Sequence, residues 1–199
     1  MAVTVGVLAL QGDFALHQRS LEMLEILAPK IRHSEELGTC DGLIVPGGES
    51  TTFTKMLMET GLFDAVRLFA EKKPVMGTCA GLITLAARLV GQKRDGMETL
   101  ALIDMEVERN AYGRQADSFS SRIRVPALKP DGDFTGVFIR APKIRSLGKG
   151  TEAVAFRGDE TVAARNRNVL VTTFHPELTD DLRFHRYFVE EFIGRTSKS

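Results

Sequence analysis

Cys79 is the side chain in this sequence best suited to nucleophilic chemistry. It lies in the segment Gly-Thr-Cys-Ala-Gly at residues 77–81, between the apolar run 74–76 and an apolar helical pattern that starts at residue 82. A strand that turns abruptly into a helix presents the residue at the bend, and glycine and alanine neighbours allow the close approach. Unpaired N–H groups and the dipole at the helix N-terminus favour a thiolate. The alternative is that Cys79 is a small buried residue in a glycine-rich turn.

A nucleophilic cysteine needs a base, and the base needs an acceptor that orients it. His175 directly follows the apolar run 169–174, and Glu177 comes two residues later. In an extended segment, residues i and i+2 point the same way, so Glu177 could orient His175 while His175 faces the cysteine. The alternative is an exposed His-Pro-Glu turn. For the three other histidines, His17, His33 and His185, we expect solvated or packing roles.

Two consecutive glycines supply the third element of a possible acyl-transfer site. Gly47 and Gly48 lie in the segment Pro-Gly-Gly-Glu-Ser at residues 46–50, and their N–H groups could point toward a developing oxyanion. The N–H of Ala80, directly after the cysteine, is the second expected donor. A Gly-Gly pair is also common in plain tight turns. The loop lacks the Gly-x-x-x-x-Gly-Lys-Ser/Thr pattern of a phosphate-binding loop.

The first half of the chain alternates strand and helix patterns. Buried strands are predicted at residues 3–10, 43–45 and 74–76, and helices at 16–27, 53–59, 62–72 and 80–89, with residues 50–52 as N-cap candidates. This alternation predicts an α/β fold around a mostly parallel sheet. Sites in such sheets form at the carboxyl ends of strands, and Gln11, Gly47-Gly48 and Cys79 each follow such an end.

The second half has a different pattern. Strands are predicted at residues 100–107, 123–125 and 134–139, followed by an antiparallel hairpin series at 154–156, 162–165 and 169–174 with turns at 158–159 and 166–168. An amphipathic helix over 182–193 closes the fold. We expect one domain over residues 1–195 and a flexible tail at 196–199.

Composition excludes several classes of function. The 199 residues are 43% hydrophobic and 26% charged, which suits one compact domain without disulfides or metals. Lys plus Arg and Asp plus Glu each number 26, so no net field attracts nucleic acid or an anionic membrane. The two cysteines, Cys40 and Cys79, form no metal-binding spacing. With no targeting pattern and no apolar run of membrane-spanning length, a cytoplasmic protein is expected.

Three motifs together resemble the signatures of class I, triad-type glutamine amidotransferases: Pro-Gly-Gly-Glu-Ser, Gly-Thr-Cys-Ala-Gly and Phe-His-Pro-Glu at 174–177. The resemblance narrows to the glutaminase subunit of the two-component pyridoxal 5′-phosphate synthase through Leu-Ala-Leu-Gln-Gly-Asp at 8–13, the segment 108–119 and Phe-Ile-Arg-Ala-Pro at 138–142. It covers essentially the whole chain. The family more often has Ser-Phe where this chain has Ala111-Tyr112.

The resemblance implies a fold, an activity and a set of site residues. The fold would be a single-domain, flavodoxin-like three-layer sandwich. Cys79 would attack the side-chain amide of L-glutamine and form a glutamyl thioester, with His175 as general acid/base and Glu177 as its orienter. The residues implied in substrate binding are Gly47, Gly48, Glu49, Arg109, Ile139 and Arg140. A zwitterion needs a cation for its carboxylate and an acceptor for its ammonium, so Arg109 or Arg140 and Glu49 are chemically reasonable.

A partner is also implied. In the family, ammonia passes through a channel into a separate (β/α)8-barrel synthase subunit, whose docking activates the glutaminase. The candidate docking residues are Gln11, Gly12, Asp13, the opening of the first helix and part of the segment 109–119. No cofactor and no metal are expected in this chain. The alternatives are an amidotransferase that feeds another acceptor, such as imidazole glycerol phosphate synthesis, a non-hydrolytic scaffold with a degenerate bend, and a cysteine peptidase of similar fold.

Overall fold

The computed structural model describes residues 2–91, 97–109, 111–112, 118–128 and 132–194. Asn110, residues 113–117 of the segment that carries part of the family resemblance, residue 195 at the expected domain boundary, and the expected tail 196–199 lie outside the described residues.

A seven-stranded sheet forms the centre of the protein, with the strand order β10-β11-β12-β4-β3-β1-β2. The five strands from β12 to β2 run parallel, and β11 and β10 extend the sheet antiparallel. The bounds are β1 Val5–Leu8, β2 Lys30–Ile31, β3 Gly42–Val45, β4 Val75–Thr78, β10 Glu152–Arg157, β11 Glu160–Arg165 and β12 Val169–Thr172. Every residue of β1, β3, β4 and β12 is buried, as the continuous apolar runs predict for parallel strands covered on both faces.

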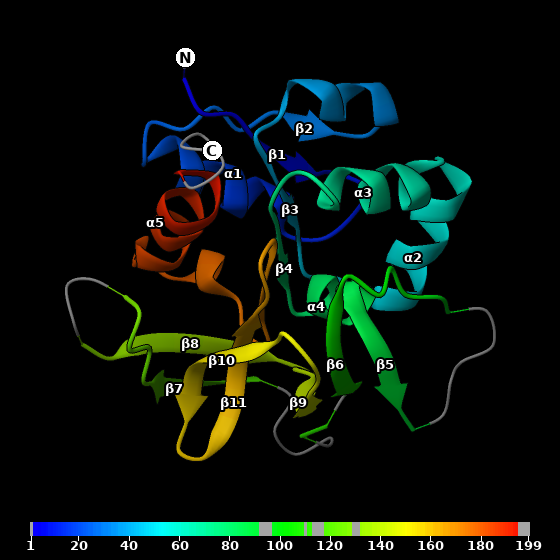
Figure 1. Cartoon of the computed structure of the whole chain (residues 1–199). Helices are drawn as coiled ribbons and strands as arrows, with labels where there is room; N and C mark the ends of the chain where they lie inside the picture. The colour runs from blue at the N-terminus through cyan, green and yellow to red at the C-terminus, as the bar shows by residue number, and fades with distance from the viewer. Residues whose placement is uncertain (1, 92–96, 110, 113–117, 129–131, 195–199) are drawn as a thin grey trace.

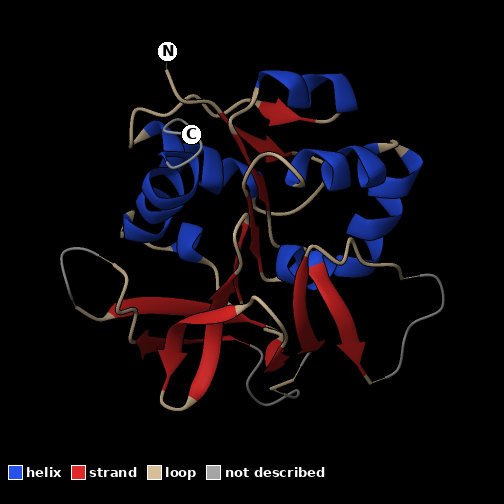
Figure 2. Ribbon diagram, in the orientation of Figure 1, coloured by secondary structure: helices blue, strands red, loops and turns tan. Residues whose placement is uncertain are grey.

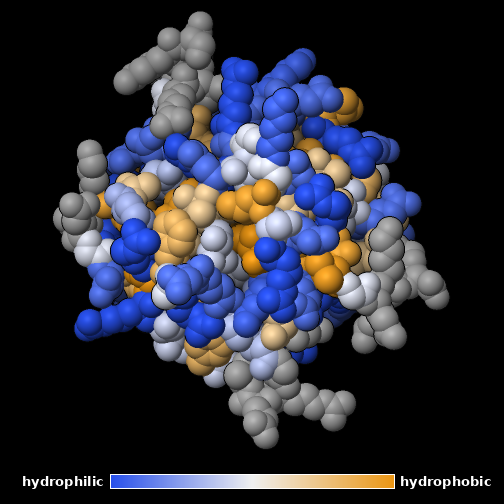
Figure 3. Space-filling view, turned by 60° about the horizontal axis from the view of Figure 1, so that its bottom comes forward, coloured by the Kyte–Doolittle hydropathy of each residue, from blue (hydrophilic) through white to orange (hydrophobic). Residues whose placement is uncertain are grey.

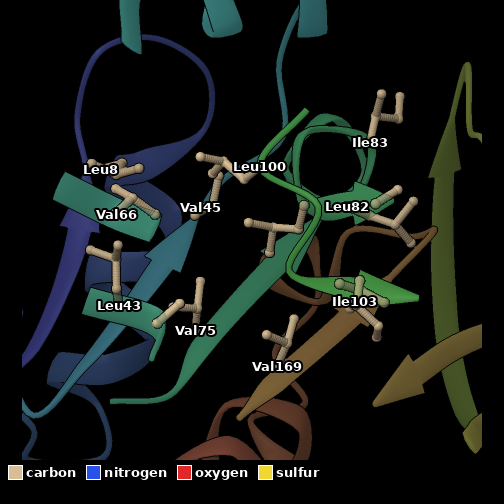
Figure 4. Close-up of a cluster of buried hydrophobic side chains, with 14 of the residues drawn as sticks. Leu8, Leu43, Val45, Val66, Val75, Leu82, Ile83, Leu100, Ile103 and Val169 are labelled. Atoms are coloured by element: carbon tan, nitrogen blue, oxygen red, sulfur yellow. The ribbon is translucent and has the colours of Figure 1, made fainter. Parts of the chain in front are cut away.

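Helices cover both faces of this sheet (Figures 1 and 2). On one face lie α1 (Phe14–Glu22), α5 (Arg183–Phe188) and the π-helical turn η4 (Val189–Ile193), whose apolar residues join one buried cluster with the sheet. On the other face lie α2 (Ser50–Glu59), α3 (Leu62–Ala70) and the 3-10 helix η1 (Ser34–Thr39). Figure 4 shows part of this second cluster, in which Leu43 and Val75 of the sheet lie near Val66 of α3. The expected three-layer α/β architecture is confirmed.

Two small sheets lie beyond the carboxyl ends of the parallel strands (Figure 1). One consists of β5 (Ala86–Val90), β6 (Ile103–Glu108) and β9 (Lys143–Leu147), and the other pairs β7 (Ser118–Ile123) with β8 (Phe134–Ile139). Figure 3 brings this end of the molecule forward and shows hydrophobic residues near its centre among hydrophilic ones. The described residues include no helix with the length and apolar character needed to cross a membrane.

The prediction was wrong about where two helices end. The expected helix over 16–27 ends at Glu22 in α1, because Glu25 adopts a positive φ of 60° and Leu27 turns back to pair with Thr4. The expected helix over 80–89 ends at Leu85 in α4 (Ala80–Leu85), and the following residues form β5. Short apolar runs do not distinguish helix from strand by periodicity, and here pairing with β6 decides the outcome.

Candidate active site

The bend at Cys79 has the geometry of a nucleophile elbow. Strand β4 ends at Thr78, α4 begins at Ala80, and Cys79 between them has φ 48° and ψ −103°. A non-glycine residue with positive φ stores strain that the surrounding structure must hold. A Cβ atom on Gly81 would lie 2.0 Å from the carbonyl oxygen of Val45, so the small residue next to the bend is a steric requirement.

The Cys79 side chain lies at the edge of a cavity, with 7% of the residue exposed. Its Sγ is 3.8 Å from the carbonyl oxygen of Ile139, the last residue of β8, and the chain continues into Arg140 with a positive φ of 43°. The strained turn at Arg140 thus lies beside the strained turn at Cys79.

His175 and Glu177 are held together at the end of strand β12. The short helix η3 (Pro176–Leu178) begins directly after His175, whose backbone N–H donates to the carbonyl of Val137 in β8 at 2.8 Å. His175 Nδ1 lies 2.7 Å from Glu177 Oε1, the pairing that the i, i+2 spacing predicts. Burial alone would lower the pKa of His175, but hydrogen bonds to Cys79 and Glu177 raise it to about 10. The same centre therefore joins a cysteine, an imidazole and a carboxylate.

We expected solvated or packing roles for His17 and His185. In the structure both residues also make polar contacts, which that expectation did not include. Both are fully buried, His17 on α1 and His185 on α5. His17 Nε2 is 3.3 Å from Glu177 Oε2 and 3.2 Å from the hydroxyl of Thr78. No spacing in the sequence links these residues to Glu177. The only available signal was a histidine among apolar residues on each of two amphipathic helices.

The glycine loop packs directly on His175. A Cβ atom on Gly47 would lie 2.4 Å from Cε1 of the His175 ring. On its other side the loop meets Gly12, where a Cβ atom would lie 1.8 Å from the Gly47 carbonyl oxygen. The Gln11 amide donates to the carbonyl of Glu49 at 2.7 Å. Gln11 and Gly12 therefore both contact the loop at residues 47–49.

Glu49 is the N-cap of α2, in place of the expected residues 50–52. Its carboxylate accepts hydrogen bonds from the backbone N–H groups of Thr51 at 3.2 Å and Thr52 at 2.7 Å. Partial burial opposes ionisation, but these hydrogen bonds lower the pKa of Glu49 to about 2. The preceding loop places Glu49 in the extended conformation that a cap needs, whereas Ser50 is already helical.

Arg109 is the first residue after strand β6, and its side chain contacts the N-terminal end of α2. One guanidinium nitrogen is 3.2 Å from Thr51 Oγ1 and 3.6 Å from Glu49 Oε1. Because Arg109 and Glu49 are already paired, the cation and the anion expected to bind a zwitterion lie side by side at one end of the site.

A cavity of about 290 Å³ connects these groups. This volume is close to the lower end of the range of roughly 300–1,000 Å³ typical of small-ligand sites. Its lining residues are Asp13, Gly48, Glu49, Ser50, Cys79, Ala80, Ile83, Arg109, Ile139, Arg140 and His175. Four of the residues predicted from sequence do not line the cavity: Gln11, Gly12, Gly47 and Glu177. Each of them packs against residues of the site from outside the cavity.

One group of side chains among the described residues has the composition of a metal site. Ligand atoms of Asp13, His175 and Glu177 lie within 4.8 Å of one another. The ligand atoms of His175 and Glu177 already bond each other, so a metal at this point would have to break the pair. We therefore assign the group to the hydrogen-bonded centre described above.

The model of the SNO glutamine amidotransferase family matches residues 7–194. A protein of Dehalococcoides mccartyi strain 195 named pyridoxal 5′-phosphate synthase subunit PdxT is 51% identical over 188 residues, 94% of this chain and 95% of that protein. A protein of the same name from Thermus thermophilus is 48% identical over 192 residues, 96% of this chain and 98% of that protein.

Solved structures agree. One described as a crystal structure of glutamine amidotransferase superposes with a TM-score of 0.88 at 48% identity, covering 96% of this chain and 98% of its own. A second, described as a putative GMP synthase protein from Thermoplasma acidophilum, has a TM-score of 0.67 at 17% identity over the whole of this chain and 96% of its own. At that identity the likeness shows the fold alone.

Proposed function

Because the chain belongs to the SNO glutamine amidotransferase family, we propose that it hydrolyses L-glutamine to L-glutamate and ammonia through Cys79, His175 and Glu177. The single observation that carries the proposal is the His175 ring, held by Glu177 at 2.7 Å and lining the same cavity as Cys79 on its strained elbow. The names of the relatives support the further assignment of the chain as the glutaminase subunit of pyridoxal 5′-phosphate synthase.

The first half of the reaction forms a thioester. Cys79 Sγ attacks the carbon of the glutamine side-chain amide, and the carbonyl electron pair moves to oxygen. His175, which holds the thiol proton, passes it to the amide nitrogen as the C–N bond breaks. Ammonia leaves, and the glutamyl group stays bonded to sulfur.

The second half releases glutamate. A water molecule attacks the thioester carbon while His175 takes one of its protons, and the C–S bond breaks as the carbonyl re-forms. The proton taken from water stays on His175, and the sulfur is released without a proton, which restores the state from which the reaction began. Glu177 stays ionised throughout: burial opposes its charge, but the neighbouring imidazoles of His17 and His175 outweigh that effect and lower its pKa to about 2.

Backbone N–H groups stabilise the tetrahedral oxyanion. We assign this role to Ala80, directly after the nucleophile, and to Gly48. Both residues line the same cavity as Cys79, which supports the assignment. The contact between Gly47 and the His175 ring supports it further, because that contact keeps the glycine loop against the base.

The amino-acid end of glutamine binds at the opposite end of the cavity. Glu49 accepts the ammonium group, because its carboxylate has lone pairs beyond those used by Thr51 and Thr52. Arg109, together with the exposed Arg140 after Ile139, binds the carboxylate. Glu49 and Arg109 lie 3.6 Å apart, and a zwitterion needs such neighbouring opposite charges.

The ammonia passes to a (β/α)8-barrel synthase subunit in this proposal. Gln11, Gly12 and Asp13 form part of the docking surface. The contacts of Gln11 with Glu49 and of Gly12 with Gly47 give a bound partner a direct route to the glycine loop. Such coupling would keep glutamine hydrolysis low until the partner is present. Both described cysteines are free thiols, which suits the reducing cytoplasm.

The test measures glutamate release by the protein mixed with its synthase subunit. Cys79→Ala is expected to abolish release while the complex still assembles, and His175→Asn is expected to do the same. Cys40→Ala is the matched control, because Cys40 is a free buried thiol outside the cavity. Glutamine hydrolysis by Cys79→Ala at the wild-type rate would disprove the proposed chemistry. A wild-type complex that assembles but hydrolyses no glutamine would disprove the proposed hydrolase activity.

A further inference from the structure

Two buried histidines extend the polar centre away from the cavity. His17 and His185 line no part of the cavity, yet both residues are completely buried and their rings lie 5.2 Å apart. Burying two imidazoles is unfavourable unless their nitrogens are paired, so the contacts they make need an explanation beyond filling space.

The contacts form a line that ends at Glu177. His185 Nε2 lies 2.9 Å from His17 Nδ1, and His17 Nε2 lies 3.3 Å from Glu177 Oε2. The other oxygen of the same carboxylate binds His175. Oε2 has no hydrogen-bond partner among the described residues, and His17 Nε2, 3.3 Å away, is the ring nitrogen that lies beside it. The hydrogen bond of good geometry at Nε2 is the one to the hydroxyl of Thr78 at 3.2 Å, so Nε2 is shared between Thr78 and Glu177.

The charges on the line determine which nitrogen carries each proton. Burial lowers the pKa of His17, and it lowers the pKa of His185 to about 3, so both rings are neutral near pH 7. A neutral His17 with a bare Nε2 would point a lone pair at the anionic oxygen of Glu177. Nε2 therefore carries the proton, Nδ1 is the acceptor, and His185 Nε2–H donates to it.

The remaining atom agrees with this assignment. His185 Nδ1 is then unprotonated, and among the described residues it has no hydrogen-bond partner. The line thus ends in a buried acceptor instead of a buried N–H. Its donors all point one way, from His185 to His17 and from His17 toward Thr78 and Glu177.

We propose that His17 is a positioning residue for glutamine hydrolysis, which holds the free oxygen of Glu177 through Nε2–H, and that His185 holds His17 in the tautomer this requires. The inference rests on the proposed function for its kinetic consequence. Glu177 lies on η3, a helix of only three residues. Anchoring it from α1 and α5 keeps the His175 ring aimed at Cys79.

Variants of His17 separate positioning from packing. His17→Leu fills much of the space without a donor, whereas the amide nitrogen of His17→Gln can occupy the place of Nε2. With the synthase subunit present, we expect His17→Leu to lower kcat about ten- to hundredfold, the usual effect of losing a hydrogen bond to a charged group, with little change in KM. We expect His17→Gln to recover most of the loss and His185→Leu to lower kcat about two- to tenfold.

A control variant and two checks on each protein accompany the kinetic measurements. His33→Leu is the control, because His33 is exposed and contacts none of these groups. Equilibrium unfolding of each variant confirms that it is folded at the assay temperature, and alkylation of Cys79 counts the active sites. Equal kcat for His17→Leu and His17→Gln, at either the wild-type or an impaired level, would overturn the proposal, as would a change confined to KM.

Nitrogen NMR of the labelled wild-type protein tests the arrangement without any turnover. We expect both His17 and His185 to be neutral and protonated on Nε2 at pH 7, with assignments taken from His17→Gln and His185→Gln. Protonation of His17 on Nδ1 would overturn the proposal. A wild-type complex that fails to hydrolyse glutamine but shows the expected tautomers would instead disprove the proposed function.

Discussion

Replacing Gly47 by alanine is expected to lower kcat for glutamine hydrolysis about 100-fold while the protein stays folded. The added Cβ atom would lie 2.4 Å from His175 Cε1 and 3.1 Å from Nδ1. The first separation is about 1 Å shorter than the roughly 3.5 Å at which two carbon atoms are in contact. Either the ring or the glycine loop must therefore move by about 1 Å.

Both movements damage the site. Moving the ring lengthens its 2.7 Å contact with Glu177 or turns it from Cys79, and moving the loop displaces Gly48 from the oxyanion. A misplacement of about 1 Å in an active site costs on the order of 100-fold in rate. The position has no positive φ, so alanine strains the backbone little and the effect on folding is expected to be small.

The assay compares Gly47→Ala with Gly38→Ala in the presence of the synthase subunit. A Cβ atom on Gly38 would meet nothing within 4 Å, so this variant carries the same chemical change without the collision. We expect Gly38→Ala to keep the wild-type kcat within about twofold. Wild-type kcat in a folded Gly47→Ala protein would refute the argument that the glycine loop and the His175 ring are packed against each other in the active state.

Lowering the pH from 7 to 5 is expected to reduce the free energy of unfolding by about 2 kcal/mol through His185. Its folded pKa of about 3 lies below the value near 6.5 of a histidine in the unfolded chain, so the unfolded state binds the proton and gains stability. Urea unfolding at both pH values should show this loss in the wild type and not in His185→Gln; equal losses would contradict the burial of a neutral ring. Glu49→Ala is expected to cost about 1 kcal/mol by removing the cap of α2, whereas Glu59→Ala, at the exposed end of the same helix, should change stability by less than about 0.5 kcal/mol. Arg109→Gln should raise KM for glutamine more than it lowers kcat; a loss confined to kcat would exclude substrate binding as its role.

Local patterns predicted the elements that carry the site. The apolar runs before Cys79 and His175 correspond to β4 and β12, and the i, i+2 spacing of His175 and Glu177 correctly predicted their contact. These predictions succeeded because a buried parallel strand, a turn and an adjacent pair of residues are each encoded within a few positions. The predicted helix ends at residues 27 and 89 were wrong, because the residues after Glu22 and Leu85 pair with other segments of the chain, Leu27 with Thr4 and β5 with β6.

The sequence by itself determined the α/β class, the elbow and the glycine loop, because steric demands at a bend act between neighbours in the chain. Only the tertiary structure decided what lies behind the site. His17 and His185 are 168 positions apart and meet at 2.9 Å because α1 and α5 pack on the same face of the sheet. Their burial makes an unpaired nitrogen costly, and this connects them to Glu177. A histidine on an amphipathic helix carries no such information until the fold supplies its neighbours.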